Sequence, residues 1–391
     1  MKPSTIVVAG GLAQRAGYGG HAWVFLQYLL GFRRLGYDVL FVDRLETEWC
    51  ADEDADRRSA EQTRNLAYLE RAMSTIGTPV PYAVLCDGGT RVIGMERCEL
   101  VDRLRRSVML LDVMGFLDDD ELLDAAPLRV FLDVDPGFPQ MWRALGWANL
   151  FTRHDAYVTV GANIGRRDCR IPTGGVDWLP TRPPVVLEHW PAARDDARTA
   201  AITTVAAWRG PFSSIEYEGE TYGLRAHQFR RFSALPRRTD ASFELALDID
   251  PADEHDRDLL LGDGWALAEP RDVAADVGSY RSYVQRSRAE LMIAKGMYVQ
   301  ARSGWFSDRS ACYLASGRPV LAQDTGLRDH YPVGAGLLTF STLEEAVAAV
   351  ERLNRGYALH AAAARRIAEE YFDSDRVLGL LLRALGVAAS A

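Results

Sequence analysis

A strand, a glycine-rich loop, a helix and a second strand fill residues 4–43, and this pattern constrains the fold more than any other feature of the chain. The β-branched run Ser4–Ala9 leads into the glycine-rich segment Gly10–His21, and a long apolar stretch, Ala22–Leu35, ends at Gly36. The hydrophobic run Tyr37–Asp43 reads as the second strand. A βαβ unit of this kind requires a parallel sheet covered by helices. The sequence therefore predicts an α/β fold.

The same alternation of strands and helices continues to the end of the chain. Short hydrophobic runs predict further strands at Val108–Val113, Arg129–Asp133, Ala156–Val160, Ile202–Trp208, Phe243–Asp248, Met297–Gln300 and Val320–Gln323. Longer periodic stretches predict helices at Ser279–Ala294, Leu343–Asn354, Tyr357–Phe372 and Ser374–Leu385.

A proline-rich break divides the chain into two parts. With 391 residues and about 150 residues per domain, two domains are expected. The segment Ile171–Pro191 contains five prolines and two glycines in 21 residues, a composition that cannot sustain a helix. We therefore predict a first domain at 1–188, a second at 189–372 and a C-terminal helix within 373–391.

Charge and cysteine content argue against several classes of protein. The formal net charge is −9, so the chain lacks the basic excess that binds a nucleic-acid backbone. Its five cysteines are scattered with no CxxC pair, a pattern typical of a reducing compartment. No apolar run reaches the roughly 18 residues of a membrane span, and the start lacks a signal-peptide pattern. We expect a cytoplasmic protein with no nucleic-acid partner and no integral membrane segment.

The first candidate site is the glycine-rich loop after the first strand. Gly17, Gly19 and Gly20 would let the backbone approach a substrate at the carboxyl edge of the sheet, although the spacing is not that of the dinucleotide fingerprint. His21 lies where this loop meets its helix and could act as a catalytic base tuned near neutral pH. The alternatives are a structural turn and a histidine bonded to the backbone.

The second candidate site is the segment Arg302–Val320. Ser307 is a natural helix N-cap, and the helix start would bring backbone N–H groups, Asp308 and Arg309 to one anion, as binding of a diphosphate requires. The alternative is a surface ion pair between Asp308 and Arg309. We expect Arg309→Ala to weaken nucleoside diphosphate binding with little change in stability.

These features together resemble a GT-B glycosyltransferase over essentially the whole chain. The helix predicted in this segment ends at Gly317. Gly317, Pro319 and Val320 match the Gly-x-Pro-Val motif of that family. The resemblance implies two Rossmann-like domains that face a cleft, a nucleoside-diphosphate sugar in the second domain, an acceptor in the first, and a final helix that returns to the first domain. Retaining members carry two glutamates where this chain has Gly304 and Cys312, which favours an inverting reaction.

The resemblance also suggests further donor ligands. Arg209 directly follows the strand Ile202–Trp208, where GT-B enzymes place a cation against the diphosphate, although an exposed loop arginine is the alternative. Gln323, Asp324 and Thr325 end a later strand where related enzymes hold sugar hydroxyls. Lys295, by contrast, is expected to cap the C-terminus of the helix Ser279–Ala294.

An acidic pair after a first-domain strand offers a second candidate base. Asp133-Val134-Asp135 matches a DxD metal motif, but Pro136-Gly137 ends the strand at once, so no metal is predicted there. Asp135 is instead the alternative to His21 as general base. Phe138 and Trp142 could line an apolar acceptor pocket or belong to the core.

The sequence thus predicts a metal-independent, cofactor-free glycosyltransferase of the hexosyltransferase type, whose co-substrate is a nucleoside-diphosphate sugar. The acceptor would be a small-molecule natural product, as in antibiotic biosynthesis, or a cell-surface polysaccharide. Alternative functions are a nucleotide-sugar epimerase of the same fold and a catalytically silent binding partner. A homodimer is left open.

Overall fold

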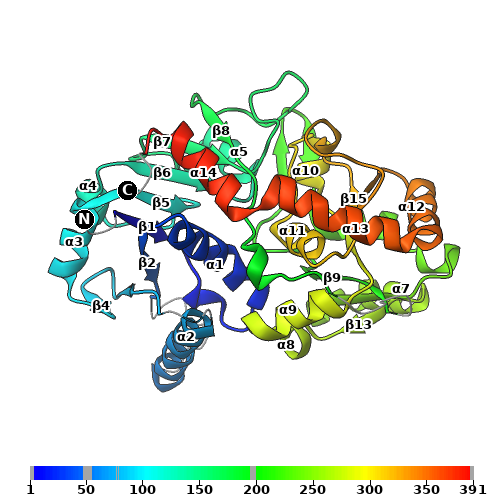
Figure 1. Ribbon diagram of the computed structural model, residues 1–391, viewed down its shortest axis with the longest axis horizontal. Coiled ribbons are helices and arrows are strands. Elements are labelled where there is room, and N and C mark those ends of the chain that lie inside the picture. Colours follow the sequence, from blue (N-terminus) through cyan, green and yellow to red (C-terminus); the bar gives the residue numbers. More distant parts are fainter. Residues whose placement is uncertain (1–3, 47–54, 76, 78, 194–199, 388–391) are drawn as a thin grey trace.

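The computed structural model describes residues 4–46, 55–75, 77, 79–193 and 200–387. It contains two sheets of mainly parallel strands, each covered by helices, and the two sheets lie side by side (Figure 1). The first sheet and its helices precede residue 181, and the second sheet begins at Ile202. This arrangement confirms the predicted α/β class with two Rossmann-like sheets.

The first sheet has eight strands in the order β4-β3-β2-β1-β5-β6-β7-β8. All neighbours are parallel except β3 and β4. The strand order reverses between β1 and β5, so the loop after β1 lies at a topological switch point, where α/β sheets bind ligands. The strands are β1 Thr5–Ala9, β2 Asp38–Arg44, β3 Tyr82–Cys86, β4 Arg91–Ile93, β5 Ser107–Val113, β6 Arg129–Asp133, β7 Ala156–Thr159 and β8 Trp178–Pro180.

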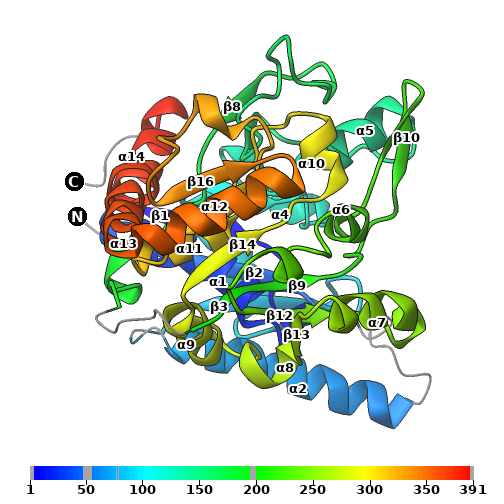
Figure 2. The ribbon, with the colours of Figure 1, turned by 90° about the vertical axis from the view of Figure 1, so that its right-hand side faces the viewer.

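The second sheet has six parallel strands in the order β13-β12-β9-β14-β15-β16. Its switch point lies between β9 and β14. The strands are β9 Ile202–Ala207, β12 Phe243–Asp248, β13 Ala266–Ala268, β14 Ala289–Met292, β15 Val320–Gln323 and β16 Leu337–Phe340. A separate hairpin of β10 Ile215–Tyr217 and β11 Glu220–Tyr222 extends from this half toward α5 of the first (Figure 2).

Helices cover both sheets. Those of the first half are α1 Gly19–Arg34, α2 Ala55–Thr75, α3 Arg97–Arg105, α4 Asp120–Ala125 and α5 Phe138–Ala144. Those of the second half are α6 Arg225–Arg231, α7 Glu254–Gly262, α8 Pro270–Val273, α9 Val277–Arg286, α10 Gly296–Gln300, α11 Asp308–Ala315, α12 Leu343–Arg355, α13 Tyr357–Ile367 and α14 Ser374–Ala384.

Strand β1 shows why this sequence needs helices on both faces of its sheet. Ile6 and Val8 are fully buried in the cluster that includes α1, whereas Val7 and Ala9 are fully buried in a second cluster with α3 and α4. Because side chains alternate along a strand, an uninterrupted apolar run is stable only in a sheet that is covered on both sides.

The chain crosses between the two halves twice, and the crossings lie side by side. Val185 N donates to Phe372 O at 2.7 Å, and Ser374 N donates to Val185 O at 2.9 Å. Helix α14 then packs on α1 of the first half, where Gly31 leaves room for Leu378 and Arg34 bonds Asp375 at 2.8 Å (Figure 1).

Two sequence predictions are wrong in the segment from Ser279 to Gln300. The predicted helix Ser279–Ala294 ends at Arg286, and Ala289–Met292 is the buried strand β14. The predicted strand Met297–Gln300 is instead part of the short helix α10. Short apolar runs do not distinguish a buried strand from a buried helical turn, so both elements were assigned to the wrong class.

Candidate functional site

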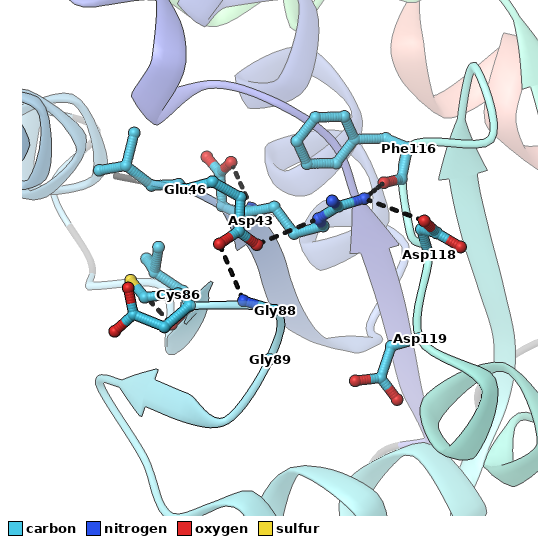
Figure 3. A network of polar contacts seen from close by, with 12 residues as sticks. Asp43, Glu46, Cys86, Gly88, Gly89, Phe116, Asp118 and Asp119 are labelled. Atoms are coloured by element: carbon cyan, nitrogen blue, oxygen red, sulfur yellow. Dashed lines mark hydrogen bonds and ion pairs between the residues drawn. The ribbon is translucent and has the colours of Figure 1, made fainter. Parts of the chain in front are cut away.

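A buried carboxylate holds the glycine-rich loop after β1 in place. Asp43 at the end of β2 accepts hydrogen bonds from Leu12 N at 2.9 Å and Ala13 N at 2.7 Å, and it is fully buried. Burial raises the pKa of this carboxyl to about 7. Figure 3 shows Asp43, Glu46 and Phe116 within the surrounding polar network. Arg44 Nε lies 3.7 Å from Glu46 Oε1, and Arg44 Nη1 donates to Phe116 O at 3.4 Å. The loop is thereby fixed against the sheet edge.

Helix α1 begins in close contact with the second half of the molecule. Gly19 N donates to Ala274 O at 2.9 Å, and a Cβ atom at Gly19 would lie 2.1 Å from Asp276 O. A Cβ atom at Gly20 would lie 2.7 Å from the ring of Tyr280. These two glycines therefore allow the helix to start directly against α8 and α9.

The start of α1 forms one wall of a cavity of about 300 Å³, which we call the anion pocket. The predicted substrate residues Gly17, Gly19 and Gly20 line it together with His21. Its opposite walls come from the second half: Val205, Ala206, Ala207, Arg225, Asp248, Pro270, Ala274, Tyr280, Asp308 and Arg309. The positive end of the α1 dipole favours negative charge at this position.

Arg309 lies in the anion pocket but is not the surface residue that the sequence suggested. Its side chain is 10% exposed, Nε forms an ion pair with Glu290, and Nη1 donates to Val205 O at 2.8 Å. The buried Nη2 has no hydrogen-bond partner among the described residues. The alternative of a surface pair with Asp308 is wrong, because the carboxylate partner is Glu290.

This pairing argues against the expectation that Arg309→Ala leaves stability almost unchanged. Glu290 is fully buried, and removing its cation would leave a carboxylate in a site of low polarity. Breaking a buried ion pair in this way costs about 3–5 kcal/mol.

Arg225 is a second cation in the anion pocket that sequence reasoning missed. It donates from Nη1 to Ala207 O at 3.0 Å and from Nε to Ile293 O at 3.2 Å. Within the described residues no carboxylate forms an ion pair with it. Burial, with a smaller effect from the charge of Arg309, lowers the pKa of Arg225 to about 10. No motif marks Arg225, and the β10–β11 hairpin separates its helix α6 from the first strand of the second half.

The other predicted donor ligands make bonds within the fold. Gln323 bonds Ala294 N and Gln228, and Thr325 Oγ1 donates to Trp305 O. Asp324 accepts from Gly326 N, Leu327 N and Arg328. Ser307 precedes α11 and forms no side-chain cap. The side chains of Gln323, Asp324 and Thr325 thus all have hydrogen-bond partners within the fold.

A larger cavity of about 690 Å³, which we call the open cleft, adjoins the anion pocket. Both cavities are lined by Tyr18, His21, Ala207 and Asp248. The open cleft is further lined by Arg15, Met114, Val134, Asp135, Trp208, Arg209, Gly210, Pro211, Phe212 and Asp250. Arg209 is 58% exposed and pairs with Asp253. It lines the open cleft, whereas Arg225 and Arg309 line the anion pocket.

His21 lies where the two cavities meet. Its Nε2 is 2.8 Å from Gly11 O, and because a carbonyl only accepts, Nε2 carries the proton and Nδ1 keeps a lone pair. Burial lowers the pKa of His21 to about 4. The imidazole is therefore neutral at pH 7, and its pKa is not tuned near neutral pH as the sequence suggested. Its bond to Gly11 O is the backbone contact that the structural alternative predicts.

Asp135, the alternative base, is engaged in an ion pair between the two halves. Its Oδ2 is 2.6 Å from Lys295 Nζ, and its Oδ1 accepts from the hydroxyl of Tyr298. Lys295 lies in the loop before α10, so the expectation that it caps a helix C-terminus is wrong. Its ammonium lies 4.8 Å from the ring centroid of Phe138 and 5.5 Å from that of Phe212.

The remaining first-half candidates make contacts within the fold. Asp133 is fully buried and accepts from Gln140 Nε2 at 2.7 Å and Thr159 Oγ1 at 2.8 Å. Phe138 and Trp142 pack against Phe212, which itself lines the open cleft. Across the described ranges, no group of three or more His, Cys, Asp or Glu side chains is placed to hold a metal ion.

Comparison with known protein families gives a match in the second half of the chain. Residues 244–379 match the family described as Glycosyl transferase-like. A search of curated proteins finds no significant match. In the described part of the chain, no helix combines the length and apolar character needed to cross a membrane.

Solved structures resemble nearly the whole chain. HepE of Anabaena in complex with UDP-glucose is 12% identical, with 98% of this chain and 100% of that chain covered and a TM-score of 0.55. An alpha-glucosyltransferase in complex with UDP and a 13-mer DNA is 10% identical, with 98% and 99% covered and a TM-score of 0.57. The pneumococcal O-GlcNAc transferase GtfA is 9% identical, with 99% of each chain covered and a TM-score of 0.50. The chain has the fold of the GT-B glycosyltransferases.

Proposed function

We propose that this protein is a glycosyltransferase that binds a nucleoside-diphosphate sugar in the anion pocket and an acceptor in the open cleft. The observation that carries the proposal is the meeting of these two cavities at His21, with Arg225 and Arg309 in the wall of one of them. The UDP complexes of proteins with the same fold support this choice of donor.

The two arginines supply what a diphosphate needs. Arg225 has only carbonyl partners, and Arg309 has a buried Nη2 that is free of protein partners within the described residues. Arg225 can therefore donate charge-assisted hydrogen bonds to phosphate oxygens, and the positive charge of Arg309 would act on the same anion. Both effects strengthen as negative charge develops on a leaving diphosphate. The N-terminus of α1 adds a favourable dipole.

His21 would remove the proton of the acceptor. The acceptor oxygen forms a bond to the anomeric carbon while the bond from that carbon to the diphosphate oxygen breaks. The proton passes to His21 Nδ1, and the electron pair leaves with the diphosphate. This single displacement inverts the anomeric configuration.

Arg225, Arg309 and the helix dipole together would offset the charge of the leaving group, so we propose that the reaction needs no divalent metal. The acceptor would be a small-molecule natural product or the end of a cell-surface polysaccharide. The cleft volume of about 690 Å³ lies within the range typical of sites for small ligands.

Calorimetric titration with UDP, dTDP and GDP, followed by incubation with the matching sugar nucleotides in excess EDTA, tests this function. We expect micromolar-range binding of one nucleotide and release of its sugar to water or to an added acceptor. Conversion of the sugar nucleotide into an isomer without release would indicate an epimerase. Binding without any turnover across an acceptor panel would indicate a silent homologue, and activity that returns only with Mg²⁺ or Mn²⁺ would contradict metal independence.

A further inference from the structure

A cavity of about 300 Å³ lies between the final helix and both halves of the molecule, and we call it the tail cavity. Leu179 and Pro180 of β8 line it from the first half, His330 and Tyr331 from the second, and Leu380 from α14, which lies next to β8 (Figure 1). Within the described residues, it shares no lining residue with the anion pocket or the open cleft. The proposed function therefore assigns it no role.

One wall of the tail cavity is apolar and partly open to solvent. Val377 and Leu381 of α14 are buried, whereas Leu380 is 48% exposed, and Leu179 adds a further aliphatic side chain from β8. Sites for small molecules combine such an apolar lining with a few polar groups, and the volume of about 300 Å³ lies at the lower end of their range. The apolar wall therefore offers a surface that a hydrocarbon group could cover.

The polar group that distinguishes the tail cavity is the guanidinium of Arg182. The residue lines the cavity and is half-buried. Its guanidinium carbon lies 5.7 Å from the ring centroid of Tyr331, which also lines the cavity, and 5.3 Å from that of Tyr371. Among the described residues no carboxylate forms an ion pair with Arg182. A guanidinium has several N–H donors, so its contact with the Tyr331 hydroxyl leaves donors for a ligand.

His330, the other titratable polar residue of the lining, does not add a second positive charge. Burial, together with the charges of Arg166 and Arg182, lowers its pKa below the ordinary value of 6.5. The carboxylates of Asp168 and Asp329 act on His330 in the opposite direction but do not line the tail cavity. One arginine beside an apolar wall therefore suits a ligand with a single negative charge.

From this arrangement we infer that the tail cavity binds a small apolar carboxylic acid, whose carboxylate pairs with Arg182 and whose hydrocarbon body covers Leu380 and Leu381. The planar fork of a guanidinium matches a carboxylate through two parallel hydrogen bonds. A phosphate monoester fits less well, because it carries more than one negative charge near pH 7 and would leave part of that charge unpaired.

The variant Arg182→Met removes the charge and keeps an apolar side chain of similar length. Arg376→Met is the matched control, because Arg376 is an exposed cation of α14 that does not line the tail cavity. A second variant, Ala384→Trp, adds bulk at an exposed position that does line the cavity and leaves the charge of the protein unchanged. It locates the ligand independently of Arg182.

The probes are octanoate, octyl phosphate, octyltrimethylammonium and octan-1-ol, which share one hydrocarbon chain and differ in charge. Dissociation constants are measured by calorimetry on the full chain, and melting temperatures show whether each variant is folded. We expect wild type and Arg376→Met to bind octanoate about 10- to 100-fold more tightly than Arg182→Met does, because the charge-assisted bond is lost. Ala384→Trp should also bind octanoate more weakly than wild type.

The other probes test the charge of the ligand. Octan-1-ol and octyltrimethylammonium should bind wild type more weakly than octanoate does, and octan-1-ol should bind Arg182→Met as well as it binds wild type. The inference is overturned if wild type does not bind octanoate, if either Arg182→Met or Ala384→Trp binds it as tightly as wild type, or if octyl phosphate or octan-1-ol binds wild type as tightly as octanoate. None of these outcomes affects the proposed function, because that function uses other residues.

Discussion

The carboxyl edges of the two sheets carry buried side chains of opposite charge, and these are used in different ways. On the first sheet Asp43, Asp112 and Asp133 are fully buried, and each accepts hydrogen bonds from its own loops. On the second sheet Arg225 and Arg309 face a cavity and are only partly paired. Buried charge that is fully bonded builds the scaffold, whereas buried charge with bonding capacity left over indicates a ligand site.

His21 belongs to neither set and gives the largest expected effect. His21→Gln keeps a donor for the carbonyl of Gly11 but loses the basic nitrogen, so sugar release should fall about 10²- to 10⁴-fold. Because the folded pKa is about 4, the imidazole of wild type is neutral above that value, and kcat/KM should fall only as the pH drops through about 4. Nucleotide affinity is the control and should not change. An acidic limb near the ordinary histidine pKa of 6.5 would argue against His21 as the base.

Substitution of Arg309 tests whether one residue at the carboxyl edge of the second sheet can both stabilise the fold and bind a ligand. Arg309→Met leaves Glu290 buried without its cation, so the free energy of unfolding in urea should fall by about 3–5 kcal/mol. The double variant Arg309→Met with Glu290→Met removes both charges and should recover most of that loss. Equal stability of the single variant and wild type would show that the pair is solvated.

Asp43 tests the scaffold role of the first edge. Asp43→Ala removes the acceptor for the backbone N–H groups of Leu12 and Ala13, and unfolding free energy should fall by about 1–3 kcal/mol. The control is Asp118→Ala, because Asp118 is 87% exposed. Urea denaturation at pH 8 measures both variants. If Asp43→Ala lost no more stability than its control, the carboxylate would not be holding the glycine-rich loop.

Substitution of Arg209 is expected to have the smallest effect on stability and nucleotide affinity, because Arg209 lies outside the anion pocket. It is exposed and paired with Asp253, so Arg209→Ala should leave both the melting temperature and the affinity for the free nucleotide unchanged within error. A clear loss of nucleotide affinity would extend the pocket into the open cleft and restore the role that the sequence suggested for Arg209.

The sequence predicted the scaffold better than the site. Runs such as Arg129–Asp133 and Phe243–Asp248 are strands with the predicted bounds, because an apolar run between polar segments fixes a buried parallel strand locally. The predictions for Ala289–Met292 and Met297–Gln300 are wrong because these runs are too short for their periodicity to distinguish a strand from a helix. The glycine-rich loop and Arg309 were found because local composition marks them.

Other site residues depend on contacts that no local pattern records. Asp135 forms an ion pair with Lys295, which lies 160 positions later in the chain. Arg225 lines the anion pocket from α6, which follows the β10–β11 hairpin. The apparent donor residue Gln323 has a favourable strand-end position, yet its amide is bonded to Ala294 and Gln228. Position along a strand predicts the sheet edge, but the partners of each side chain decide its role.

Calorimetric titration of UDP into wild type, Arg225→Met and Arg231→Met tests the central claim that the anion pocket binds the diphosphate of the donor. Arg231 lies in the same helix, is exposed and bonds only Gln228 among the described residues, so its variant changes charge equally without touching the pocket. We predict that the dissociation constant rises about 10- to 100-fold for Arg225→Met and stays unchanged for Arg231→Met, with dTDP or GDP replacing UDP if wild type prefers it. The same dissociation constant for all three proteins would contradict the account.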